Sequence, residues 1–197
     1  MLDPFAPVLR ALRVPGRPTS DYDLNKNQPL SEDRQCRPAA VLVGFQERPA
    51  GLSLILTKRA SHLKHHPGQI AFPGGKIDRG DEDAVAAALR EANEETGLGR
   101  NAVDVLGILE SHETVTGFSV TPVLARIDPT FRPVRQVDEV EEVFSVPCEH
   151  IANPRNYRIE GRMWCGQLRR YYTVPFGPYY IWGATARILR ALADRMG

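Results

Sequence analysis

The sequence predicts an α/β domain built in layers, and three observations support this. Short apolar runs typical of strands alternate with two amphipathic segments typical of helices. The length, 197 residues, is about that of one domain. Hydrophobic residues make up 42% of the chain and charged residues 25%, which is too apolar for a disordered protein.

The N-terminal segment differs in composition from the rest of the chain. Residues 1–37 are polar and rich in proline, with one short helix expected around Val8 to Val14. We therefore expect residues 1–37 to form an arm that packs on the domain, and residues 38–197 to form the domain itself.

Apolar runs predict the strands of this domain. The first two runs are separated by a turn-like segment and predict a hairpin. The expected strands are Ala39–Phe45, Leu52–Thr57, Ile70–Phe72, Val103–Leu109, Val120–Ile127, Val140–Val146 and Met163–Val174, the last broken at Gly166. A tight turn is expected at Pro73–Gly75, and a short turn of helix after Pro147.

Two helices are expected. The first is Asp81–Thr96, where Asp81 can act as the N-cap and Gly97 as the residue that ends the helix. The second is an amphipathic helix from Ile181 to Met196 at the C-terminus.

Composition also limits the partners. Lys plus Arg number 25 and Asp plus Glu 24, so the net charge of +1 argues against a nucleic-acid partner. No apolar run approaches the roughly 18 residues of a membrane span, which argues against a membrane partner. Three unpaired cysteines indicate free thiols in a reducing compartment, so we expect a cytoplasmic protein: Cys36, Cys148 and Cys165. The sequence leaves the oligomeric state open, with a homodimer among the alternatives.

The Asp81–Thr96 helix carries an acidic cluster beside its core face. Its apolar arc consists of Ala84, Val85, Ala88, Leu89 and Ala92. On the adjoining arc, Glu91, Glu94 and Glu95 are like charges at close range, which weakens a helix. A solvated acidic face is the ordinary explanation. Neighbouring alanines leave room for a partner, however, and bunched carboxylates suit Mg²⁺ or Mn²⁺.

The residues around this cluster resemble the Nudix box, Gly-x5-Glu-x7-Arg-Glu-U-x-Glu-Glu-x-Gly-U, in which U is apolar. The segment from Arg90 to Leu98 fits the second half of the box. The first half contains one extra residue, so that either Asp81 or Glu82 stands for the first acid. Membership of this family implies an α/β/α sandwich with a mixed β-sheet.

A second motif resembles the coenzyme A pyrophosphatase branch of this family. The branch signature is LLTxR(S/A), x3, Arg, x3, Gly, x3, FPGG, and the stretch from Ile55 to Gly75 fits its spacing. Ile55 replaces the first Leu, and Lys64 replaces the second Arg. The segments around Thr116 and from Trp182 to Thr185 are also similar to this branch.

The resemblance implies the roles of individual residues. Glu91 and Glu95 would be the principal ligands of Mg²⁺ or Mn²⁺, and Glu94 an additional ligand or the base that orients water. Arg90 would pair with an acid of the box. Substrate contacts are expected from Arg59, Lys64, Gly74, Gly75 and Lys76. An alternative general base lies in a later acidic run that contains Asp138, Glu139, Glu141 and Glu142.

The implied activity is hydrolysis of coenzyme A, or of its thioesters, to 3′,5′-ADP and 4′-phosphopantetheine. Another nucleoside diphosphate derivative, such as ADP-ribose or NADH, is the alternative within the family. A non-catalytic module that senses a ligand would be expected to lack one of the three glutamates, and all three are present.

Overall fold

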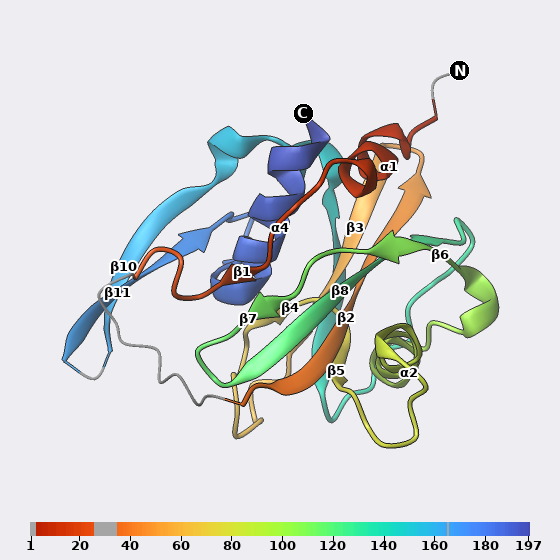
Figure 1. The fold of residues 1–197 in the computed structure, drawn as a ribbon. Coiled ribbons are helices and arrows are strands. Elements are labelled where there is room, and N and C mark those ends of the chain that lie inside the picture. The colour runs from red at the N-terminus through yellow and green to blue at the C-terminus, as the bar shows by residue number, and fades with distance from the viewer. Residues whose placement is uncertain (1–2, 26–34, 165) are drawn as a thin grey trace.

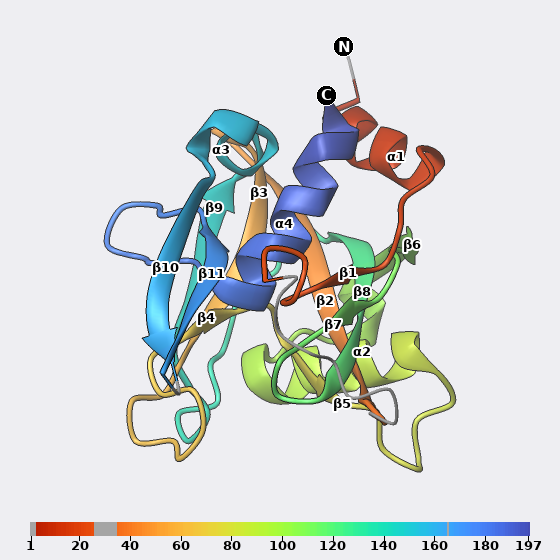
Figure 2. The ribbon, with the colours of Figure 1, turned by 60° about the vertical axis from the view of Figure 1, so that its left-hand side comes forward.

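The computed structural model describes residues 3–25, 35–164 and 166–197. Nine strands of this part of the chain form one mixed β-sheet. Helix α2 covers one face of the sheet, and α1, α3 and α4 lie over the other (Figures 1 and 2). The α/β class predicted from the sequence is thereby confirmed, and its layers are those of an α/β/α sandwich.

The helices and strands follow one another in the following order. The elements are α1 (Ala6–Arg13), β1 (Thr19–Ser20), β2 (Arg37–Arg48), β3 (Gly51–Arg59), β4 (Ile70–Ala71), β5 (Gly74–Lys76), α2 (Ala84–Thr96), β6 (Val103–Ile108), β7 (His112–Glu113), β8 (Phe118–Ile127), β9 (Val140–Pro147), α3 (Cys148–Ala152), β10 (Arg158–Trp164), β11 (Gln167–Thr173) and α4 (Gly183–Met196). Single 3₁₀ turns precede β6 and β10. Each expected helix and strand corresponds to one of these elements with shifted ends, except the strand expected at Met163–Val174, which falls on both β10 and β11.

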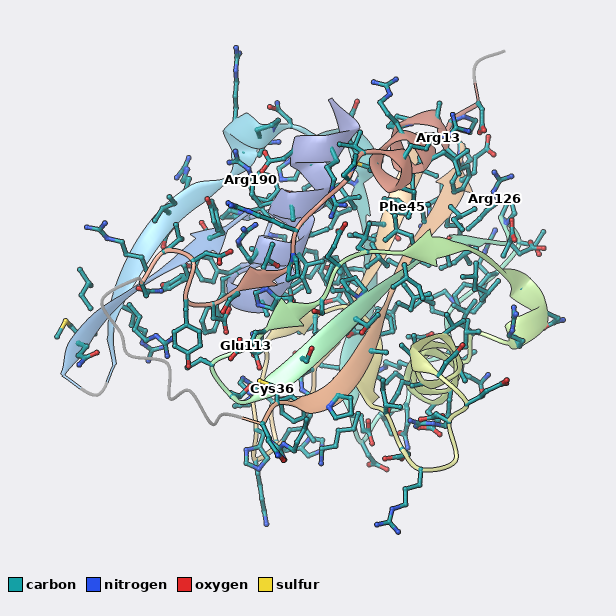
Figure 3. The ribbon with its side chains drawn as sticks, in the orientation of Figure 1. Arg13, Cys36, Phe45, Glu113, Arg126 and Arg190 are labelled. Carbon is teal, nitrogen blue, oxygen red and sulfur yellow. The ribbon has the colours of Figure 1, made fainter. Side chains whose placement is uncertain are left out.

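Strand β2 is central to the sheet. It pairs with β8 in parallel from Arg37 to Gln46, and with β3 and β5 in antiparallel fashion. Its side chains alternate between the two layers: Leu42 packs in the α2 cluster, whereas Val43 and Phe45 pack in the α4 cluster. Phe45 is fully buried (Figure 3). Both layers are therefore anchored to the same strand.

The N-terminal segment contributes to the core. Phe5, Val8 and Ala11 are buried in the same cluster as α4. Strand β1 adds to the sheet by pairing in parallel with β7. Residues 1–2 and 26–34 of the expected arm lie outside the described residues, and its boundary at residue 37 stays a prediction.

The start of α2 differs from the expectation. The helix begins at Ala84, and its N-cap is Asp83, whose carboxylate accepts a hydrogen bond of 2.8 Å from the Ala86 N–H. The prediction that Asp81 caps the helix was wrong, because Asp81 turns toward Arg90 instead. The end at Gly97, with φ of 70°, is confirmed.

The alanines of α2 also have a different role from the one expected. Ala87, Ala88 and Ala92 are fully buried against the sheet, so they leave no space for a partner. Their small side chains instead allow the helix axis to lie close to β2 and β5.

The late strand is also more extensive than predicted. The chain forms an antiparallel hairpin of β10 and β11, which begins at Arg158 rather than at Met163. The register aligns Arg158 with Thr173 and Trp164 with Gln167. Sequence pattern alone did not find the first half of β10, because Arg158, Glu160 and Arg162 interrupt its apolar residues.

Two expectations from composition concern thiols and membranes. Cys148 is a free, buried cysteine, Cys36 is half-buried, and Cys165 lies outside the described residues. Burial raises the pKa of the Cys148 thiol to about 11, so this group is an inert part of the core. Among the described residues, no helix is long and apolar enough to cross a membrane.

Gly74 allows β5 to pack closely on β2, and this role can be tested. A Cβ atom at this position would lie 2.4 Å from the Ala40 carbonyl oxygen and 2.7 Å from the Val41 Cα, both of them backbone atoms. We expect Gly74→Ala to lower the free energy of unfolding by about 1–3 kcal/mol, measured by denaturant titration. Gly80→Ala is the matched control, because a Cβ there meets nothing within 4 Å. Equal stability of the two variants would contradict this packing.

Candidate active site

The predicted site residues of the box come together where α2 packs on β5. Glu91 and Glu95 lie one turn apart on the helix. The exposed fraction of the side chain is 17% for Glu91, 5% for Glu95 and 57% for Glu94. The three carboxylates are therefore close in sequence, but they differ greatly in their access to water.

Arg90 connects the helix to the loop that precedes it. Its Nε and Nη2 donate hydrogen bonds of 2.9 and 3.0 Å to the two oxygens of Asp81. Its Nη1 donates to Glu91 Oε1 at 3.0 Å and to Glu94 Oε2 at 3.2 Å. Nη2 also donates to the Lys76 carbonyl at 3.1 Å. The hydrogen bond with Asp81 raises the pKa of Arg90 and lowers that of Asp81, so both groups are charged.

This geometry distinguishes the two candidates for the first acid of the box. Asp81 forms the bidentate pair with Arg90, and it also accepts a hydrogen bond of 2.8 Å from the Asp78 N–H. Glu82 is exposed. The extra residue in the first half of the box is taken up in the loop between β5 and α2.

The two glycines of β5 lie beside the carboxylates of α2. A Cβ atom on Gly75 would lie 2.4 Å from Glu91 Oε1. The Gly74 N–H donates a hydrogen bond to the carboxylate of Glu95. Gly75 therefore permits the Glu91 carboxylate to reach the strand backbone, whereas Gly74 permits β5 to lie close to β2.

Glu95 is the most perturbed acid of the cluster. Burial raises the pKa of Glu95 to about 8, and the negative charges of Glu91 and Glu139 add to this rise. Arg59 opposes it, with Nη1 at 4.0 Å from Glu95 Oε1. Within the described part of the chain, Glu95 Oε2 and Arg59 Nε have no hydrogen-bond partner. Such buried, unsatisfied atoms are costly to a fold and are typical of functional sites.

The carboxylate oxygens of the glutamates on α2 suit a hard divalent cation, although their side chains do not form a complete coordination site. Among the described residues, no three His, Cys, Asp or Glu side chains come together in an arrangement that could hold a metal ion. Glu91 and Glu95 are close enough for each charge to affect the other. Mg²⁺ needs only one or two carboxylates when waters and substrate phosphates complete its shell.

The four acids of the run that follows β8 have different surroundings. Glu141 pairs with Lys58 at 2.6 Å, and Glu142 accepts a hydrogen bond of 2.6 Å from the Tyr179 hydroxyl. Asp138 is exposed. The charge of Glu139 raises the pKa of both Glu91 and Glu95, so Glu139 is the member that faces the box.

A cavity of about 270 Å³ adjoins the acidic cluster on the side of Arg59 and Gly74. His66 and Gln69 also line it. The sequence carries no signal for Gln69. Thr116 and the segment Trp182–Thr185, similar to the coenzyme A branch, reach the same cavity from distant parts of the chain. Lys64 and Lys76 are exposed, and neither is among the residues that line this cavity in the described part of the chain.

Known proteins resemble this chain in sequence and in fold. Residues 36–163 match the NUDIX domain family. Proteins from Salmonella paratyphi B and Salmonella typhimurium, each named an uncharacterized Nudix hydrolase NudL, are 40% identical over 178 residues, which cover 90% of this chain and 92% of theirs. The crystal structure of RenU, a Nudix hydrolase from M. smegmatis, is 26% identical with a TM-score of 0.50, covering 60% of this chain and 74% of that one. With the box cluster on α2, these likenesses show that the chain belongs to the Nudix family of hydrolases.

Proposed function

We propose that this Nudix hydrolase cleaves the diphosphate linkage of coenzyme A, or of acyl-coenzyme A, to 3′,5′-ADP and (acyl-)4′-phosphopantetheine. The observation that carries the proposal is that residues of the coenzyme A signature and of the Nudix box lie side by side. Arg59 and Gly74 of the coenzyme A signature contact the buried Glu95 of the Nudix box, and both line the adjoining cavity.

Mg²⁺ or Mn²⁺ would be held by Glu91 and Glu95, with Glu94 as an additional ligand. The unsatisfied Glu95 Oε2 supports this assignment, because a cation would satisfy it and would remove the repulsion with Glu91. When bound, the cation neutralises phosphoryl charge and lowers the pKa of a coordinated water. Arg90 keeps the carboxylate of Glu91 directed toward β5 through its 3.0 Å hydrogen bond.

The remaining roles fall to groups beside the cluster. Arg59 would bind a phosphoryl oxygen of the diphosphate, since its Nε is buried and without a hydrogen-bond partner among the described residues. Two carboxylates are candidates for accepting the proton of the attacking water, namely Glu94 and Glu139. Glu94 is tied to Arg90 at 3.2 Å, whereas Glu139 faces the acidic cluster from the opposite loop. We favour Glu139 for this reason.

The substrate assignment is tested by comparing substrates directly. The purified protein would be incubated with Mg²⁺ or Mn²⁺ and with coenzyme A, dephospho-coenzyme A, ADP-ribose or NADH, and the products identified by mass spectrometry. We expect the largest kcat/KM for coenzyme A or an acyl derivative, with 3′,5′-ADP as a product. Faster hydrolysis of ADP-ribose or NADH would overturn the coenzyme A assignment, while binding without hydrolysis of any of them would indicate a sensing module.

Replacing Glu95 tests the ligand assignment. Glu95→Gln keeps the size of the side chain but removes the charge, and we expect kcat/KM to fall at least about 100-fold at saturating Mg²⁺. Glu149→Gln, an exposed acid on α3, serves as the control and should retain activity. Circular dichroism would verify that both variants fold. Near-normal turnover of Glu95→Gln would exclude a ligand role.

The same buried carboxyl predicts how the metal-free protein responds to pH. The pKa of Glu95 is raised from 4.5 to about 8, so the folded state binds more protons than the unfolded state between these values. The free energy of unfolding should therefore fall as pH rises from about 4.5 to about 8, by on the order of 3 kcal/mol. Glu95→Gln should remove this decline and be the more stable protein at pH 8, as measured by urea titration with EDTA present. A wild-type stability that rises across this window would contradict the buried, repelled state of Glu95.

A further inference from the structure

A second cavity, of about 330 Å³, continues the one beside Arg59. The two cavities share part of their lining: Asp21, His66, Val115, Thr116, Trp182 and Gly183. The second cavity leads away from the acidic cluster to the β10–β11 hairpin, where Arg162, Arg169, Arg170 and Tyr171 line it. One groove therefore runs from the Nudix box to an arginine-rich hairpin.

Two of these arginines form a cross-strand pair. Arg162 of β10 and Arg169 of β11 are direct partners in the antiparallel register, which places both side chains on the same face of the hairpin. Like charges directly opposite each other destabilise a two-stranded sheet. Within the described part of the chain, no acidic side chain forms an ion pair with Arg162. An anion between the two guanidinium groups would relieve this repulsion.

The rest of the groove supports an anionic occupant. Asp21 is the one acid among the described lining residues of either cavity. Its oxygens are already engaged, with His112 Nε2 at 3.2 Å and the Val115 N–H at 2.8 Å. The positive charge of Arg169, which lies over the Tyr22 ring, also lowers the pKa of Asp21, so this one acid offsets part of the charge of three arginines. Tyr171 and Trp182, whose ring centroids lie 5.2 Å apart, form an aromatic wall next to the arginine pair. The hairpin end of the groove therefore combines positive charge with aromatic side chains.

We propose that Arg162 and Arg169 bind a second anionic group of the substrate, separate from the diphosphate that is cleaved. This inference rests on the proposed function, which positions the diphosphate near Glu91 and Glu95. Two groups on coenzyme A substrates carry such a charge: the 3′-phosphate of the ribose, and the carboxylate of a dicarboxylic acyl chain. Both chemistries suit the planar, multiply donating guanidinium group. Lys64, the cation expected from the signature, lines neither described cavity.

The test measures discrimination between charged and uncharged substrate pairs. Coenzyme A is compared with dephospho-coenzyme A, and succinyl-coenzyme A with butyryl-coenzyme A, in the wild type, in Arg162→Gln and in the Arg162→Gln/Arg169→Gln double variant. We expect the preference in kcat/KM for the charged member of one pair to fall about 5- to 30-fold, because Arg162 is exposed and its contact is partly screened. Loss in the first pair identifies the phosphate, and loss in the second the carboxylate.

Controls separate this role from a structural one. Arg158→Gln removes an exposed charge from the same strand outside both cavities and should leave both preferences unchanged. The unfolding midpoint of Arg162→Gln should equal or exceed that of the wild type, since a like-charge contact is lost. The proposal would be overturned if both preferences persisted in the double variant, or if they fell equally in Arg158→Gln. A Lys64→Gln variant is measured alongside, and a loss of preference in that variant alone would also overturn the proposal.

A binding measurement distinguishes failure of this inference from failure of the proposed function. Calorimetry without divalent metal would compare adenosine 3′,5′-bisphosphate and succinyl-coenzyme A with AMP and butyryl-coenzyme A, respectively. A loss of affinity for a charged member in Arg162→Gln supports the arginine site even if the protein hydrolyses no coenzyme A. Equal affinities of wild type and variant for all four ligands would overturn the site, whatever the hydrolytic activity.

Discussion

The hydrogen-bond network of Arg90 is the interaction on which the site depends. One guanidinium group joins the loop before α2, through Asp81 and the Lys76 carbonyl, to the glutamates on the helix. A bidentate pair of this kind fixes both position and orientation, which a single ammonium group could not do. The loop and the helix are thereby held in one register, and Glu91 is directed at the glycine backbone of β5.

That network neutralises some of the carboxylates of the site but not the deepest one. Asp81 and Glu91 share the positive charge of Arg90, and Glu94 reaches it from the solvent side. Glu95 lies outside this network, because it is deeper in the protein, and the Arg59 Nη1 is 4.0 Å from its Oε1. A buried carboxyl with a raised pKa costs stability, and a fold optimised for stability alone would replace it with an apolar residue. The cation that we propose for this site would offset that cost.

The parts of the fold that sequence pattern predicted are those governed by local contacts. Two apolar runs separated by a turn-like segment predicted the β2–β3 hairpin, and Gly97 predicted the end of α2, because each depends on neighbours in the chain. The N-cap was misassigned to Asp81 because three acids precede the helix, and only the distant Arg90 decides which of them caps it. Strand β5 was expected as a turn, since its pairing with β2 is a contact between residues far apart in sequence.

The site shows the same division between local and distant contacts. The spacing of Glu91, Glu94 and Glu95 predicted one acidic face, but burial separates the three in a way that spacing cannot express. The roles left open in the acidic run could not be ranked, because Lys58 and Tyr179 engage two of its members from other elements. The groove was not predictable, since it is assembled from β3, the loop after β7, the hairpin and the start of α4.

The groove has opposite charges at its two ends, and this polarity has a mechanistic consequence. Glu91 and Glu139 give one end a negative charge, to which Glu95 adds once it loses its proton, so a diphosphate is repelled there until a cation is bound. Arg162 and Arg169 make the other end attractive to anions with or without metal. A substrate with a second anionic group would therefore be held at the hairpin while its diphosphate is still repelled. A cation held by Glu91 and Glu95 would offset that repulsion, so a substrate whose second anionic group reaches the hairpin would be favoured over one that lacks this group.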